Sequence, residues 1–112
     1  MAIFYATFNV VSNRALTNTM PVLKGVDAEG LRPITTSSSS QTLQRGGADW
    51  SAPNHGYVSV RGDADMWIHI DTSPTAVKGA VGATDGIDWF IAANAYREFS
   101  VEPGEKIAVI NA

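Results

Sequence analysis

The sequence predicts an all-β protein, a single small antiparallel β-sandwich with a jelly-roll-like arrangement of about seven or eight short strands. Polar and apolar residues alternate over short runs such as 57–61 and 66–70, as in strands with one buried face. Turn residues, Gly62-Asp63 and Pro103-Gly104 among them, separate such runs. No segment of a dozen residues shows a convincing helical stripe.

Length and composition restrict the protein class. At 112 residues the chain is expected to form one domain, 1–112, large enough for a core of its own. The absence of cysteine excludes disulfides, thiolate metal sites and thiol catalysis. No apolar run approaches the ~20 residues of a membrane span, and residues 1–5 do not begin a secretory signal. We therefore expect synthesis in a cytoplasm and no membrane partner.

The charge pattern argues against a nucleic-acid partner. The net charge is −3, and the eight Lys and Arg residues are scattered instead of forming a basic stripe. The charged fraction of 17% is below the ~25% usual for soluble domains. A surface with so few charges suggests that a partner covers part of it.

The first expected strand is 3–11, in which Phe4, Ala6, Phe8 and Val10 share one face. This face is the more apolar of the two, so we place it on the core. An aromatic strand of this kind is expected to be tied into a sheet.

Residues 12–33 are expected to form a long irregular loop or arm. Proline and glycine interrupt any regular pattern there, yet the segment also carries six large apolar residues. Loops this long are uncommon in compact domains unless they are functional. We expect this one to pack over the sandwich or to reach onto a neighbouring molecule.

The remaining elements follow in order. The serine- and threonine-rich residues 34–44 could be a flexible linker, but we favour a polar edge strand. A loop at 49–54 contains Trp50. The later strands are expected at about 57–61, 65–71, 76–81, 87–92, 96–101 and 106–111.

Chemical motifs are sparse. His69 shares a strand face with Asp71, and such a pair could orient a proton carrier, although a polar residue on a solvent face is the simpler interpretation. Asp63, Asp65 and Asp71 could share a calcium ion, but the segment lacks the calcium-loop pattern. No nucleophile elbow or phosphate-binding loop occurs. We expect no catalytic residues, no metal, no cofactor and no enzymatic activity.

The three tryptophans, Trp50, Trp67 and Trp89, allow two interpretations. Exposed tryptophans on a sandwich often stack on sugar rings. Buried ones serve as large anchors in a core or at a subunit interface. We favour the core or interface interpretation.

Several segments of the second half resemble a set of small tailed-bacteriophage virion proteins. They are GYVSV at 56–60, DADMWI at 63–68, SPTA at 73–76, FIAA at 90–93 and EFSVEPGEKIAVI at 98–110. The resemblance covers about half the chain, 55–112. It implies a β-sandwich protein of the capsid or tail, most simply a capsid decoration (cement) protein. It carries over no catalytic residues.

From this resemblance we expect the major capsid protein as partner, a place on the capsid surface and a homotrimer, because cement proteins commonly sit at threefold positions. The predicted capsid or subunit contacts are Leu16, Met20, Val22, Leu23, Leu31 and Trp50. Two alternatives remain. One is a carbohydrate- or receptor-binding module of a phage tail or fibre that uses the tryptophans. The other is a small enzyme of cupin-like shape.

Overall fold

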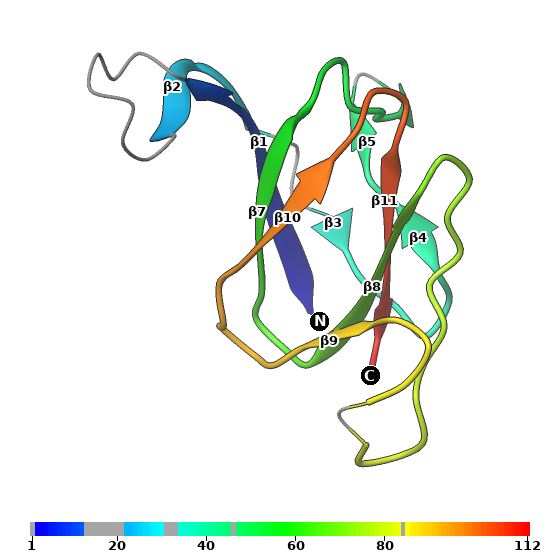
Figure 1. Ribbon diagram of the computed structural model, residues 1–112. Helices are drawn as coiled ribbons and strands as arrows, with labels where there is room; N and C mark the ends of the chain where they lie inside the picture. The colour runs from blue at the N-terminus through cyan, green and yellow to red at the C-terminus, as the bar shows by residue number, and fades with distance from the viewer. Residues whose placement is uncertain (1, 13–21, 31–33, 46, 84) are drawn as a thin grey trace.

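The computed structural model describes residues 2–12, 22–30, 34–45, 47–83 and 85–112, and for 10–12 and 22–30 the description covers the backbone only (Figure 1). The described residues form strands and connecting segments without a helix. The strands are β1 Ile3–Ser12, β2 Val22–Gly30, β3 Ile34–Thr35, β4 Gln41–Thr42, β5 Gln44–Arg45, β6 Ala48–Asp49, β7 Gly56–Gly62, β8 Met66–Asp71, β9 Trp89–Ile91, β10 Arg97–Val101 and β11 Lys106–Asn111.

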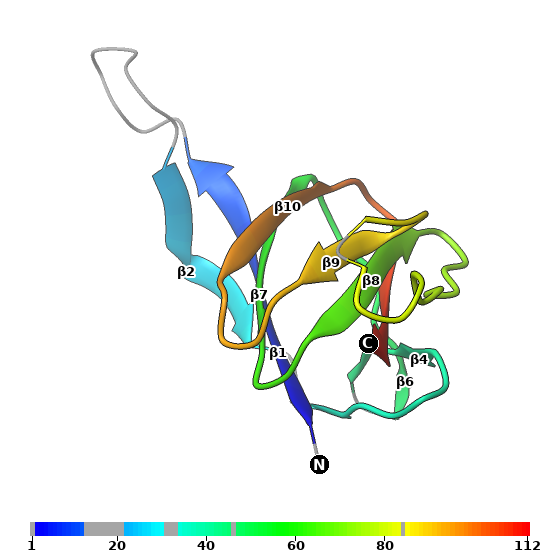
Figure 2. The same ribbon diagram turned by 90° about the horizontal axis from the view of Figure 1, so that it is seen from below.

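Two main antiparallel sheets form the body of the described structure and confirm the predicted all-β sandwich. The first sheet has the order β10-β7-β1-β2, with β3 also paired to β1. The second sheet has the order β4-β11-β8-β9, and β5 and β6 form a separate small pair. Figures 1 and 2 show the sheets as two layers, with β1 and β7 in one and β8 and β11 in the other.

The alternation seen in the sequence decides which face of each strand is buried. In β1, Phe4, Ala6 and Phe8 are buried, as predicted, and the side chain of Val10, also predicted for the core, lies outside the described part of the structure. On β7 their cross-strand neighbours Val58 and Val60 are buried on the same face of the sheet. The second sheet contributes the opposite side of the core from β8 and β11: Met66, Ile68, Ile107 and Val109. Burying side chains of this size contributes roughly 1.5–3 kcal/mol each, so the two inner faces hold the sheets together.

The connections wrap the chain around the core. The chain crosses between sheets from β7 to β8, and again from β9 to β10 and from β10 to β11. As a result β10 pairs with β7 in one sheet while β11 pairs with β8 in the other. The consecutive strands β7 and β8 thus pair with the consecutive strands β10 and β11, one pair in each sheet. The chain of a jelly roll is wrapped in a similar way.

The turn at Pro103-Gly104 is formed as predicted. The backbone N–H of Glu105 donates to the carbonyl of Glu102 at 3.0 Å, which closes a four-residue turn. Gly104 takes a φ of 89°, in the region that side chains disfavour. Proline followed by glycine suits this turn type, so the local sequence alone is sufficient to place β11 after it.

Within the expected irregular arm at 12–33, Val22–Gly30 instead forms strand β2 along β1, and 13–21 and 31–33 lie outside the described residues. Ser12 pairs with Val22 at one end and Thr7 with Gly30 at the other. The register shifts between Phe8 and Val10, where the partners are Glu29 and Lys24. Residues 25–28 are accommodated at this irregularity, which interrupts the pairing without ending the strand.

The expected strand at 76–81 is wrong. That stretch belongs to an irregular segment without strand pairing, and Val77 and Val81 are exposed. A Cβ atom on Gly79 would lie 2.5 Å from Cζ2 of Trp67, so the backbone itself covers the indole ring. The alternation of small and apolar residues there does not mark a half-buried strand.

The expected polar edge strand at 34–44 is present only as the short strands β3 and β4, separated by a bend at Ser38 and Ser39. β3 pairs with β1 in the first sheet, and β4 pairs with β11 in the second. The segment therefore passes from one layer to the other. The small β5–β6 pair that follows it was not expected from the sequence.

Candidate functional site

A two-stranded ribbon extends from one corner of the sandwich. β1 pairs with β7 from Phe4 to Asn9, and beyond Asn9 its described partners lie only in β2. We call residues 10–12 and 22–24 the ribbon. Figures 1 and 2 show this end of β1 and β2 directed away from the two sheets.

Among the described residues, no third strand pairs with the ribbon. An isolated pair of strands is marginally stable in water, and a third strand or a packed surface is needed to hold it. Its outer edges also present backbone groups that can pair with another chain. The ribbon sequence contains Val10, Val11, Val22 and Leu23, residue types that favour burial. Both features suit contact with a second molecule.

The predicted contact residues are distributed as follows. Val22 and Leu23 lie in the ribbon, on β2. Leu16, Met20 and Leu31 fall outside the described residues. Trp50 is 4% exposed, and its ring lies 5.6 Å from that of Phe8. Its side chain is therefore part of this chain's own core, which corrects its placement among the surface contacts.

The other two tryptophans have opposite environments. Trp67 is buried and meets the ring of Phe90 edge-on at 5.2 Å, so the core interpretation is confirmed for Trp67 as well as for Trp50. Trp89 is 58% exposed and tilts against Phe99 at 5.8 Å, where the edge strands β9 and β10 approach. Of the three, Trp89 is the one whose ring can contact an external ligand.

A histidine–aspartate pair fastens the segment that covers Trp67. We call residues 72–83 and 85–88 the capping segment. The Nδ1 atom of His69 lies 2.5 Å from Oδ1 of Asp88, and its Nε2 atom lies 3.7 Å from Oδ2 of Asp71. The other Asp88 oxygen accepts the backbone N–H of Val77 at 2.7 Å. Asp88, at the end of the capping segment, thus joins β8 to Val77 within the same segment.

The electrostatics of this pair favour the imidazolium form. The hydrogen bond to Asp88 is the main cause that raises the pKa of His69, and Asp71 adds to it, while partial burial opposes the shift. The Asp88 side chain is only 3% exposed. The sequence pointed to Asp71 as the partner, but the closer one is Asp88. Asp88 lies at the end of an irregular segment, where no sequence pattern indicates a contact with His69.

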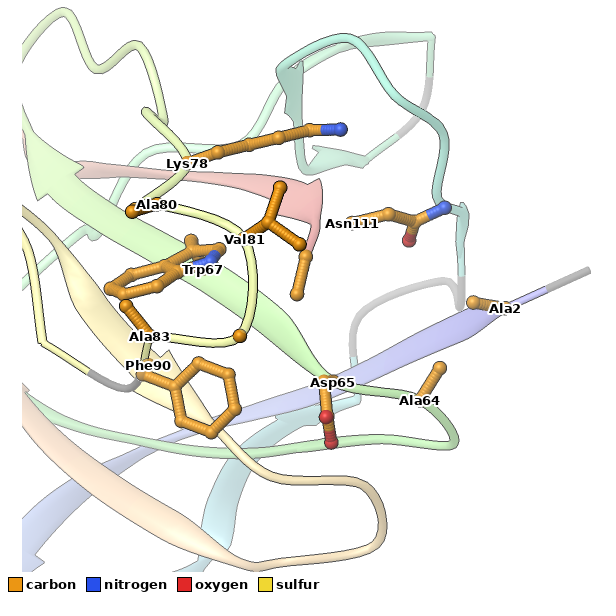
Figure 3. A pocket seen from close by; sticks show the side chains of 13 residues that line it. Ala2, Ala64, Asp65, Trp67, Lys78, Ala80, Val81, Ala83, Phe90 and Asn111 are labelled. Carbon is orange, nitrogen blue, oxygen red and sulfur yellow. The ribbon is translucent and has the colours of Figure 1, made fainter.

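Beside the capping segment lies an open pocket of about 610 Å³ (Figure 3). Trp67 and Phe90 form one wall, and the backbone of residues 78–83 forms another. Lys78 and Asp65 are the charged residues of the lining, and Figure 3 shows them on different sides. Oδ1 of Asp65 accepts the backbone N–H of Ala93 at 2.8 Å. The remaining lining side chains are mostly small, so the pocket offers few groups for specific recognition.

The three aspartates considered for calcium act separately. Asp63 accepts the N–H of Ile3 at 2.7 Å, Asp71 accepts that of Thr72 at 2.7 Å, and Asp65 is engaged with Ala93. Among the described residues, no group of three or more acidic, histidine or cysteine side chains is arranged to hold a metal ion. Asp63 and Asp65 thus hold distant segments of the chain against the β7–β8 connection, and Asp71 bonds to the residue that follows it.

Comparisons with family models, with curated proteins and with solved structures gave no match for this chain. In the part of the chain that the structure describes, no helix is long and apolar enough to cross a membrane.

Proposed function

We propose that this protein is a structural virion component that binds and stabilises a bacteriophage capsid, as a decoration (cement) protein. The observation that carries the proposal is the ribbon, a two-stranded extension with apolar sequence beyond the last β1–β7 pair, Asn9 with Tyr57. The resemblance of residues 55–112 to small tailed-phage virion proteins supports the same assignment.

The ribbon suits the major capsid protein as partner. Pairing of an exposed strand edge with another chain supplies main-chain hydrogen bonds, and apolar residues on the same strands supply burial. A compact sandwich anchored in this way bridges neighbouring capsid subunits and opposes the pressure of packaged DNA. The place of action is the outer capsid surface, and the assembled unit is a homotrimer.

Exposed apolar residues outside the ribbon are consistent with further contacts. Val81, Ile87 and Trp89 are all exposed. Large apolar side chains at a surface often mark an interface. In a homotrimer, these residues would supply subunit contacts while the ribbon engages the capsid.

The alternative of a carbohydrate- or receptor-binding module based on tryptophan is weakened by the burial of Trp50 and Trp67. Trp89 alone keeps an exposed ring. A sugar surface built on several stacked tryptophans therefore does not fit, and the capsid-binding function remains the stronger proposal.

The test uses a variant in which an Asn-Gly pair replaces residues 11–23. Val10 and Lys24 are opposite one another, so a two-residue hairpin turn can join them. The control is Asp85→Ala, which changes an exposed residue of the capping segment that has no part in the proposed contacts. Both variants are mixed with capsids that lack the protein, and the bound fraction is measured by co-sedimentation.

We expect the control to saturate the capsids at a fixed ratio and the shortened variant to stay in solution. Circular dichroism and a cooperative melting curve establish that the shortened variant is folded. Capsid binding by the folded shortened variant at the wild-type ratio would refute the role of the ribbon. Light scattering of the wild-type protein tests the homotrimer.

A further inference from the structure

The outer face of the first sheet carries a stacked arrangement of two tyrosines and an arginine. Tyr5 on β1 and Arg61 on β7 are opposite one another in the strand register. The Arg61 guanidinium carbon lies 4.6 Å from the centre of the Tyr5 ring and 5.8 Å from the centre of the Tyr96 ring. The guanidinium is thus in cation–π contact with both rings.

Strand alternation explains why these side chains share the outer face. Phe4 and Ala6 point into the core, so Tyr5 between them points outward. Arg61 follows the buried Val60 on β7 in the same way. Tyr96 precedes β10 and is 75% exposed.

A shallow hollow of about 260 Å³ lies at this arrangement. The neighbouring cross-strand pair, Thr7 and Ser59, adds two hydroxyl groups to its lining. The hollow is slightly smaller than the ~300 Å³ at which drug-sized pockets begin, so it suits a ligand of about one sugar ring.

The guanidinium is available to an external anion. Within the described part of the chain, Arg61 forms no ion pair with a carboxylate, and its described contacts are the two tyrosine rings. Stacking fixes the plane of the guanidinium and leaves its N–H groups at the edge. A fixed guanidinium edge matches the two oxygens of a carboxylate.

We propose that this hollow is a binding site for a carboxylated sugar of the uronic-acid class. Arg61 holds the carboxylate, Tyr5 and Tyr96 offer ring faces to the sugar's C–H groups, and Thr7 and Ser59 bond to its hydroxyls. A bare inorganic anion would use the guanidinium alone and leave the rings and hydroxyls without a role. The combination of a cation, aromatic rings and hydroxyls favours an acidic sugar.

The proposal is independent of capsid binding. Tyr5 and Val10 are separated by five residues of β1, or about 17 Å at ~3.3 Å per residue. A ribbon engaged with a capsid would therefore leave the hollow exposed at the other end of the strand. Such a particle could attach to acidic polysaccharide on a cell surface.

The experiment compares two disaccharides, glucuronosyl-β-1,4-glucose and its neutral counterpart cellobiose, by saturation-transfer NMR and titration calorimetry with the full chain. The variants are Arg61→Gln and Tyr96→Ala. The matched control is Arg97→Gln, which removes the same charge from the neighbouring strand β10. Melting curves establish that each variant is folded.

We expect the wild type and Arg97→Gln to bind the acidic disaccharide at least about tenfold more tightly than cellobiose. Both site variants should lose about tenfold or more of that affinity. Equal binding of the two sugars, no binding by the wild type, or unchanged affinity in Arg61→Gln would overturn the proposal. So would competition by inorganic phosphate at the same concentration as the sugar, because that result identifies a simple anion site.

Discussion

The imidazole of His69 and the carboxylate of Asp88 meet at 2.5 Å although 19 residues separate them in the chain. His69 belongs to β8, and Asp88 lies at the end of the capping segment, just before β9. Through its second oxygen Asp88 also binds the N–H of Val77. This pair therefore keeps the capping segment closed over Trp67.

The first prediction concerns pH. The pKa of His69 is raised above its ordinary 6.5 in the folded state, mainly by Asp88. Folding therefore favours the protonated ring, and the pair's contribution is fully present below pH 6.5. It is lost as pH rises through the folded-state pKa. Urea unfolding of the wild type and of His69→Gln between about pH 5 and 9 should show this decline in the wild type alone. If the free energy of unfolding changed with pH in the same way in both proteins, the prediction would be wrong.

The second prediction concerns Asp88. In Asp88→Ala the backbone N–H of Val77 and the His69 ring lose an acceptor whose side chain is nearly buried. We expect the free energy of unfolding to fall by about 1–3 kcal/mol. Asp85→Ala, on the exposed part of the same segment, should change it by less than about 0.5 kcal/mol. Similar losses in the two variants, measured by urea unfolding, would argue against the described role of Asp88.

The third prediction concerns the approach of Gly79 to Trp67. Gly79→Ala places a methyl group about where the indole ring lies, 2.5 Å from its Cζ2 atom. We expect a loss of about 1–3 kcal/mol and a red shift of tryptophan emission as the segment moves away. The control is Gly82→Asn, because Gly82 has no atom within 4 Å of a built Cβ and asparagine tolerates its φ of 78°. Matching emission spectra in the two variants would be inconsistent with this contact.

The fourth prediction separates the tryptophans. Trp50→Ala leaves a large cavity beside Phe8, so we expect a loss of about 3–5 kcal/mol. Trp89→Ala removes a half-exposed ring and should cost about 1 kcal/mol. Chemical denaturation of both variants measures the difference. If the order of the two losses were reversed, Trp50 would not occupy the core.

The sequence predicted those features that depend on neighbouring residues. Alternation in residues 3–11 identified Phe4, Ala6 and Phe8 as core residues, because successive side chains of a strand point to opposite faces. Pro103-Gly104 specified its turn by backbone conformation alone. The all-β class and most strand positions in the second half followed from the same local rules.

The tertiary structure decided which strands and side chains meet. Local alternation does not say that residues 22–30 pair with β1, or that 76–81 cap Trp67 instead of forming a strand, because both outcomes depend on distant partners. The candidate site has the same origin. Val22 and Leu23 could be selected from their apolar character, but only strand pairing places them in a ribbon outside the sandwich. Asp88 meets His69 because of the order of the strands and the path of the segment between them. The alternation of residues along a strand does not specify that order or that path.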